Sequence, residues 1–185
     1  MLLVYFTAYG WSNICMLHWM DMSKKVTRLY EQFQPEHYDL TLDIDRDAMS
    51  FTGTVVIKGK KTGRPSERLT FHQKGLKITS ATITKHDKKG DQTLVVKRIN
   101  NQDSYDEVRL HTEDMAYPGD YTVALQFSGH INKDMHGIYP CFFKHNGEAK
   151  KLIATQFESH HAREALPCID EPEAKSTFDL ILTTP

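Results

Sequence analysis

Residues 36–45 read E-H-Y-D-L-T-L-D-I-D, and this stretch indicates the fold class. Its apolar residues alternate with polar ones at period two, which places them together on one face of a β-strand. These apolar residues are Tyr38, Leu40, Leu42 and Ile44. The pattern predicts a half-buried antiparallel strand.

Short runs of similar character follow along the chain, at the spacing of an all-β domain. We expect strands at residues 51–60, 68–72, 76–84, 93–99, 105–111, 121–131, 152–158 and 176–183. Connectors rich in Gly, Pro, Asn and Asp separate these runs, as turns require. Gly53 lies inside the second strand, where we expect a bulge or a close approach of another chain segment.

Helical character is confined to residues 23–33, and no β-α-β rhythm or glycine-rich phosphate loop is present. The pattern therefore excludes a Rossmann or P-loop enzyme. It predicts an all-β domain, either an antiparallel β-sandwich or an extended curved sheet.

Charge and cysteine content exclude several classes of protein. The 185 residues carry 23 Lys and Arg against 24 Asp and Glu, a formal net charge of -1, so we expect no nucleic-acid partner. The three cysteines, Cys15, Cys141 and Cys168, are widely spaced and form no C-x-x-C pair. Neither a disulfide framework nor a cysteine zinc site is expected, and a cytoplasmic location is favoured.

The two ends of the chain are unusual. Residues 1–20 contain no charged side chain and are mildly apolar, but they lack a basic start and a cleavage site, so we expect neither a signal peptide nor a membrane helix. We interpret residues 1–22 as an apolar extension that is not native and residues 23–185 as the domain. The last strand ends two residues before Pro185, which predicts a piece of a longer protein, lacking its last strands.

The histidines suggest no catalytic or metal site by their spacing. His160 and His161 are adjacent and would point in different directions on a strand or a helix. His161 and Glu164 are three residues apart, but no H-E-x-x-H or G-x-S-x-G motif occurs, and we predict no metal ligand here. A self-contained zinc hydrolase using His160 and His161 is an alternative that metal analysis would test.

A set of fixed spacings connects this chain to a known family. Residues 155–178 contain T-Q-F-E, then A-R, then P-C-I-D-E-P, then K-S-T-F. Together with F-x-G at 51–53 and G-I-Y at 137–139, they resemble the aminopeptidase N family of zinc metallopeptidases. The resemblance covers most of residues 33–182. It implies the amino-terminal, saddle-like β domain, which packs on a thermolysin-like catalytic domain.

The resemblance also implies what this chain lacks. The family's zinc motif, its G-A-M-E-N loop and its catalytic tyrosine are absent from the sequence. The chain is therefore expected to bind no zinc and to be inactive alone. The full-length parent would be a zinc-dependent aminopeptidase that removes N-terminal amino acids from peptides with a free N-terminus. Its catalytic domain, on the same polypeptide, would be the partner of this chain.

Two residues match family positions that reach into the catalytic cleft. The resemblance implies that Glu158 anchors the substrate's α-ammonium group and that Gln156 forms a wall of the pocket for the first residue. If residues 152–158 form a strand, these two side chains share one face, while Thr155 and Phe157 lie on the other.

The neighbouring residues are interpreted as structural. Arg163 is expected to pair with Asp170 or Glu171, and Cys168 to behave as a small buried apolar residue. The pair His160-His161 departs from common family members, which leaves the side-chain preference of the parent enzyme open.

A stand-alone β-sandwich module that binds peptide or carbohydrate is the alternative function. Its expected cue is a cluster of exposed aromatics, whereas the tyrosines are scattered over residues 105, 117, 121 and 139. We also expect the isolated chain to self-associate through the edge or apolar face that the missing strands would leave open.

Overall fold

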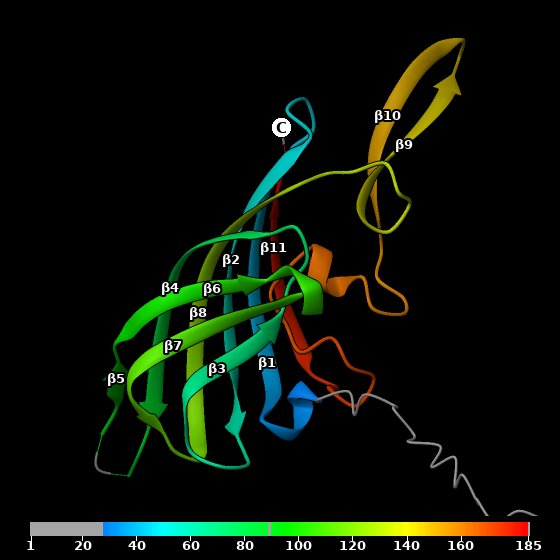
Figure 1. Ribbon diagram of the computed structural model, residues 1–185. Coiled ribbons are helices and arrows are strands. Elements are labelled where there is room, and N and C mark those ends of the chain that lie inside the picture. The colour runs from blue at the N-terminus through cyan, green and yellow to red at the C-terminus, as the bar shows by residue number, and fades with distance from the viewer. Residues whose placement is uncertain (1–27, 89, 185) are drawn as a thin grey trace, which may run out of the picture.

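The computed structural model describes residues 28–88 and 90–184, and this part of the chain is almost entirely β-structure (Figure 1). The strands are β1 (Phe33–Asp45), β2 (Ser50–Lys61), β3 (Ser66–His72), β4 (Lys77–His86), β5 (Gln92–Leu94), β6 (Val96–Gln102), β7 (Glu107–Ala116), β8 (Gly119–His130), β9 (Gly137–His145), β10 (Glu148–Gln156) and β11 (Thr177–Thr183). Three short 3-10 turns accompany them: η1 (Leu29–Glu31), η2 (Asp103–Tyr105) and η3 (Ala162–Glu164). The all-β prediction is confirmed.

The helix expected within residues 23–33 is wrong in its described part. Only the 3-10 turn η1 forms, and β1 already begins at Phe33. Leu29 and Phe33 are both buried, so tertiary burial rather than helical periodicity explains their spacing. The predictions for residues 1–22 and for a domain start at residue 23 lie outside the described residues.

Two sheets form a sandwich. A six-stranded sheet has the order β11-β1-β2-β8-β4-β5, and a three-stranded sheet has the order β3-β7-β6. The smaller sheet lies across the larger one (Figure 1), and buried side chains of both form one hydrophobic core. Phe33 of β1 meets Phe71 of β3 edge to face, with 5.3 Å between ring centroids. β11 pairs with β1 in parallel, whereas the other strand pairs are antiparallel.

The core at the centre of the larger sheet is tightly packed. Val55, Ile57, Val123 and Leu125 of β2 and β8 have 0% exposure. A Cβ on Gly53 would lie 2.6 Å from Cζ of Phe127, so glycine is needed where this ring crosses β2. The predicted close approach at Gly53 is confirmed.

A separate hairpin of β9 and β10 projects away from the sandwich (Figure 1). β9 was not predicted, because its sequence has no clear alternation and its last residues are exposed. Asn146 and Gly147 close the hairpin with φ of 52° and 82°, as a two-residue turn between His145 and Glu148. Asn-Gly is a strong hairpin signal because both turn positions need positive φ. That local signal would have located the hairpin.

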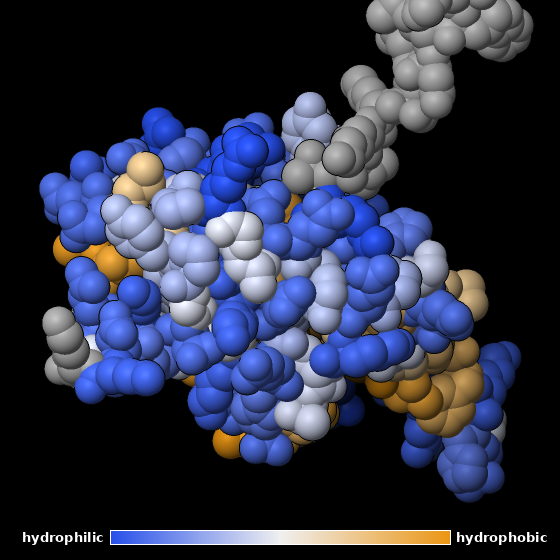
Figure 2. All heavy atoms as spheres, turned by 90° about the horizontal axis from the view of Figure 1, so that it is seen from below, coloured by the Kyte–Doolittle hydropathy of each residue, from blue (hydrophilic) through white to orange (hydrophobic). Residues whose placement is uncertain are grey.

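Figure 2 shows one face of the molecule, mostly hydrophilic, with apolar side chains gathered mainly toward one side of the view. Within the described residues, no helix is long and apolar enough to cross a membrane.

Candidate substrate-binding site

Gln156 and Glu158 lie where the hairpin returns to the body of the protein. β10 ends at Gln156, and the next residues form a turn in which the N–H of His161 donates to the carbonyl of Phe157 at 2.9 Å. The predicted strand to residue 158 is therefore two residues too long, because this turn replaces strand pairing. The peptide bond between Glu158 and Ser159 is cis.

The two faces expected for this segment remain distinct. Thr155 and Phe157 line an apolar cavity of about 520 Å³, whereas Gln156 and Glu158 do not. Both of these polar side chains are exposed. Within residues 28–88 and 90–184, neither of them forms a hydrogen bond or an ion pair. The end of β10 therefore presents an amide and a carboxylate that are available to a ligand.

The cavity lies between the hairpin and the edge of the six-stranded sheet. Its walls include Leu40 and Leu42 of β1, Leu180 and Leu182 of β11, and Ile153 of β10. The cavity is apolar and open, so it suits hydrophobic side chains from another segment of protein better than it suits a charged ligand.

The segment after Glu158 is anchored by Arg163. Its Nε donates to Oδ2 of Asp170 at 2.9 Å, and its carbonyl accepts from the N–H of Lys74 at 2.8 Å. The predicted pairing of Arg163 is thus confirmed with Asp170. Glu171, the other candidate, instead accepts from the backbone N–H of Leu29 at 2.7 Å.

Cys168 and His72 join this segment to β3. Their backbones exchange two hydrogen bonds, of 2.8 and 3.1 Å. Cys168 is buried and burial raises the pKa of its thiol, which confirms its prediction as a buried apolar residue. Burial, with a contribution from the nearby charge of Arg163, lowers the pKa of His72 to about 4. Nδ1 of this neutral ring accepts the N–H of Asp170 at 3.0 Å.

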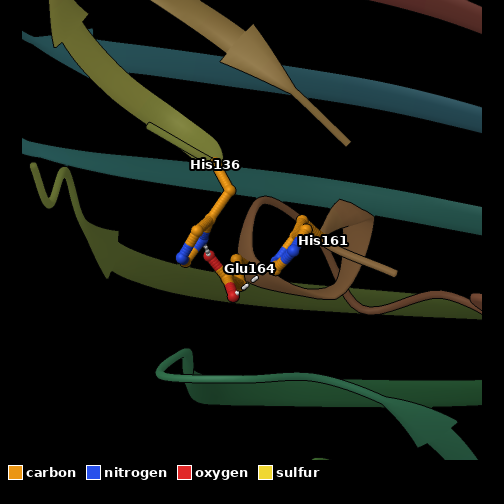
Figure 3. A group of neighbouring side chains, drawn as sticks. All are labelled: His136, His161 and Glu164. Atoms are coloured by element: carbon orange, nitrogen blue, oxygen red, sulfur yellow. Dashed lines mark hydrogen bonds and ion pairs between the residues drawn. The ribbon is translucent and has the colours of Figure 1, made fainter. Parts of the chain in front are cut away.

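Glu164 is a second carboxylate close to Glu158 in sequence, but its surroundings differ (Figure 3). Its side chain is only 6% exposed, and its carboxylate faces the Nδ1 edges of His136 and His161, whose rings stack on each other with 4.1 Å between centroids. Nδ1 of His136 lies 2.6 Å from Oε2, and Nδ1 of His161 lies 3.0 Å from Oε1. Lys74 also donates to Oε1, at 3.1 Å.

Burial disfavours ionisation of Glu164, but the hydrogen bonds from His161, His136 and Lys74 outweigh it and hold its pKa below the ordinary value. Because an ionised carboxylate only accepts, both imidazoles present Nδ1–H to it.

The sequence indicated only part of this group. The i, i+3 spacing of His161 and Glu164 is visible in the sequence, but His136 lies 28 residues before Glu164, and no local pattern links them. The alternative based on His160 and His161 also looks different in the structure. The ring of His160 is exposed and stacks on His161, but the residues whose ligating atoms converge are His136, His161 and Glu164.

Comparison with known proteins identifies the family. Residues 34–185 match the model of the Peptidase M1 N-terminal domain. The chain is 42% identical to an aminopeptidase N of Lactococcus lactis subsp. lactis, over 87% of this chain and 17% of that protein. It is 38% identical to an aminopeptidase N of Lactobacillus delbrueckii subsp. lactis, over 85% and 17%. An aminopeptidase A of Gloydius brevicauda is 31% identical, over 84% and 16%.

The chain thus spans about a sixth of the length of these relatives, with 17% of the first one covered. The family match covers nearly all of the described residues, and it agrees with the motifs at residues 155–178 and with the β-sandwich. The chain therefore belongs to the family of peptidase M1 N-terminal domains.

Proposed function

We propose that this chain is the substrate-cleft domain of a zinc-dependent aminopeptidase that removes N-terminal amino acids from peptides. In this proposal Glu158 binds the α-ammonium group of the substrate, and Gln156 lines the pocket for the first side chain. The observation that supports it is the exposed and unpaired state of both side chains at the end of β10, among the described residues of a peptidase N-terminal domain.

The chemistry of the two residues suits this role. A free α-ammonium group carries three donors and a positive charge, so a carboxylate in the cleft accepts a charge-assisted hydrogen bond from it. A peptide with a blocked N-terminus lacks that charge and is rejected. Gln156 offers both a donor and an acceptor next to this carboxylate.

Hydrolysis requires groups that this chain does not contain. Its sequence has no H-E-x-x-H motif, so a catalytic zinc and its ligands belong to the remainder of the parent polypeptide. The isolated chain is expected not to cleave peptides, and the catalytic domain of the same polypeptide is its expected partner.

The apolar surface at the C-terminal side supports such a partner. Leu180, Ile181 and Leu182 of β11 are 60%, 64% and 53% exposed, and β11 is the outer strand of its sheet. In the parent, the remaining chain would cover this surface. In the isolated chain, two copies would cover it by self-association.

We also propose a cytoplasmic location. Among the described residues Cys141 and Cys168 form no disulfide, which suits a reducing compartment.

The full-length parent enzyme tests the role of Glu158. Glu158→Gln keeps the size of the side chain but removes its charge, so kcat/KM for peptides with a free N-terminus should fall about 30-fold or more. Glu148→Gln is the matched control, because Glu148 is an exposed carboxylate at the other end of β10, and its kcat/KM should change less than twofold.

Peptides with an acetylated N-terminus complete the test. The unmodified enzyme should not cleave them, and Glu158→Gln should reduce the preference for the free amine. Equal loss of activity in both variants would contradict the assignment to Glu158. Ligand binding by the isolated chain with no dependence on a free amine would favour the binding-module alternative.

A further inference from the structure

We propose that His136, His161 and Glu164 form a binding site for a divalent transition metal ion of the Zn²⁺ type. This site lies within the chain itself and does not depend on the peptidase activity proposed above. Figure 3 shows the three side chains converging, with the carboxylate of Glu164 facing a nitrogen of each imidazole.

The three side chains already converge on one point without an ion. The ligand atoms of the three residues all lie within 4.8 Å of one another. Zinc binds imidazole nitrogen and carboxylate oxygen at about 2.0–2.2 Å, so two atoms on one tetrahedral ion are roughly 3.3 Å apart. The Nδ1 atoms of His136 and His161 lie 2.6 and 3.0 Å from the two oxygens of Glu164, which are hydrogen-bond distances and shorter than this value. Side-chain rotations that lengthen these contacts would admit an ion.

The donor set specifies the class of ion. Two imidazole nitrogens and one carboxylate oxygen are typical ligands of Zn²⁺, Co²⁺ or Ni²⁺, whereas Ca²⁺ and Mg²⁺ prefer oxygen ligands. Three protein ligands leave one tetrahedral position for water. The His136 and His161 side chains are 29% and 19% exposed, whereas Glu164 is 6% exposed. An ion would enter from the histidine side and meet the carboxylate at the base of the site.

The backbone makes room for this arrangement at Gly137. This residue has φ of +66°, and a Cβ on it would lie 2.9 Å from Oε2 of Glu164. Glycine thus lets the first residues of β9 approach the carboxylate and brings His136 next to it. The site joins two segments that are distant in sequence, the start of β9 and the turn η3.

When no ion is bound, the ammonium group of Lys74 supplies the positive charge that pairs with Glu164. Its ammonium group lies 3.1 Å from Oε1 of Glu164, and its side chain is 49% exposed. Its long, flexible stem can carry the charge into solvent when an ion enters. The ion also replaces the Nδ1 protons, and each neutral imidazole then carries its proton on Nε2.

Direct binding to the metal-stripped chain, without an affinity tag, tests the site. Titration with Zn²⁺ alone should give one equivalent bound, whereas Ca²⁺ and Mg²⁺ should not compete at tenfold excess. Co²⁺ bound to the unmodified chain should give the visible absorption of a four-coordinate ion with imidazole ligands. A spectrum that remains that of the hexaaquo ion would overturn the proposal without any variant.

Substitutions locate the ion. His136→Gln and His161→Gln should each weaken Zn²⁺ binding more than about tenfold. His160→Gln and His37→Gln are the matched controls. His160 is the neighbour of a ligand, and His37 lies in a partly exposed group with Asp39 and Asp179. Unchanged affinity in both ligand variants, or loss of affinity in His37→Gln instead, would overturn the proposal.

Lys74→Met distinguishes two interpretations of this group, a metal-binding site and a purely structural cluster. If Lys74 only supports Glu164, its removal weakens the fold and does not affect metal affinity. If it competes with an ion, Zn²⁺ binding becomes tighter, by about threefold or more, as one positive charge is removed. Weaker or unchanged Zn²⁺ binding by folded Lys74→Met would count against the site.

Discussion

β8 and β11 belong to the same sheet but differ in almost every physical respect. β8 lies between β2 and β4, and its alternate residues Tyr121, Val123, Leu125 and Phe127 are at most 2% exposed. β11 has only β1 as a neighbour, and every residue of it is exposed. A strand pattern therefore predicts pairing, whereas the position of the strand in the sheet decides how much it contributes to stability.

The largest effect should come from truncating equivalent side chains in the two strands. Leu125→Ala should lower the free energy of unfolding by about 3 kcal/mol, because it leaves a cavity in a tightly packed core. Leu182→Ala in β11 should lower it by less than about 0.5 kcal/mol. Chemical denaturation of both variants measures the difference. Similar losses in the two variants would mean that β11 is buried in solution.

A smaller effect concerns the junction between the sandwich and the segment before β11. His72 has its pKa lowered to about 4 in the folded chain, whereas in the unfolded chain it titrates near 6.5. Between pH 4 and pH 6.5 the unfolded chain binds more protons than the folded chain. The contribution of neutral His72 to the free energy of unfolding is therefore fully present above about pH 6.5, and it declines as the pH falls towards 4. The loss should reach roughly 2 kcal/mol at pH 5.

His72→Asn isolates this contribution, because the Asn side-chain oxygen can still accept the N–H of Asp170. From pH 7 to pH 5 the unfolding free energy of the unmodified chain should fall relative to that of this variant. His160→Asn, which changes an exposed ring, should give a constant difference. Parallel curves for the unmodified chain and His72→Asn would show that the junction is open to solvent.

The smallest effect on stability should accompany a clear change in association. Leu180→Lys places a charge on the exposed surface of β11, so self-association should weaken while the free energy of unfolding changes by less than about 0.5 kcal/mol. Val95→Lys is the control, because Val95 is an apolar residue that is 55% exposed and follows β5, which is at the opposite edge of the sheet from β11. Sedimentation velocity over a range of concentrations measures both variants. A monomeric unmodified chain would remove the basis for this prediction.

Much of the sandwich was predictable because strand alternation is a local property. Residues 36–45 alternate in sequence and also in burial within β1. The predicted close approach at Gly53 is also present. The prediction contained part of β10 at residues 152–158 but not β9, although Asn146-Gly147 is a local hairpin signal, because β9 has no continuous buried face.

The candidate site was predictable only in part. The motif around Gln156 and Glu158 supplied a family and two residues, but the end of β10 at Gln156 depends on the turn that follows. Propensity cannot place such an end, because it also depends on where the partner strand β9 begins, at Gly137, which pairs with Gln156.

Period-two alternation, turn residues and the family motif can all be read along the chain, and they were enough for the fold class and the family. The different surroundings of the two carboxylates Glu158 and Glu164 could not be predicted in this way. Both lie in one short segment, but one is exposed without a partner among the described residues, and the other is surrounded by His136, His161 and Lys74. Folding brings these distant residues together, and the low solvent exposure at Glu164 makes their interactions strong.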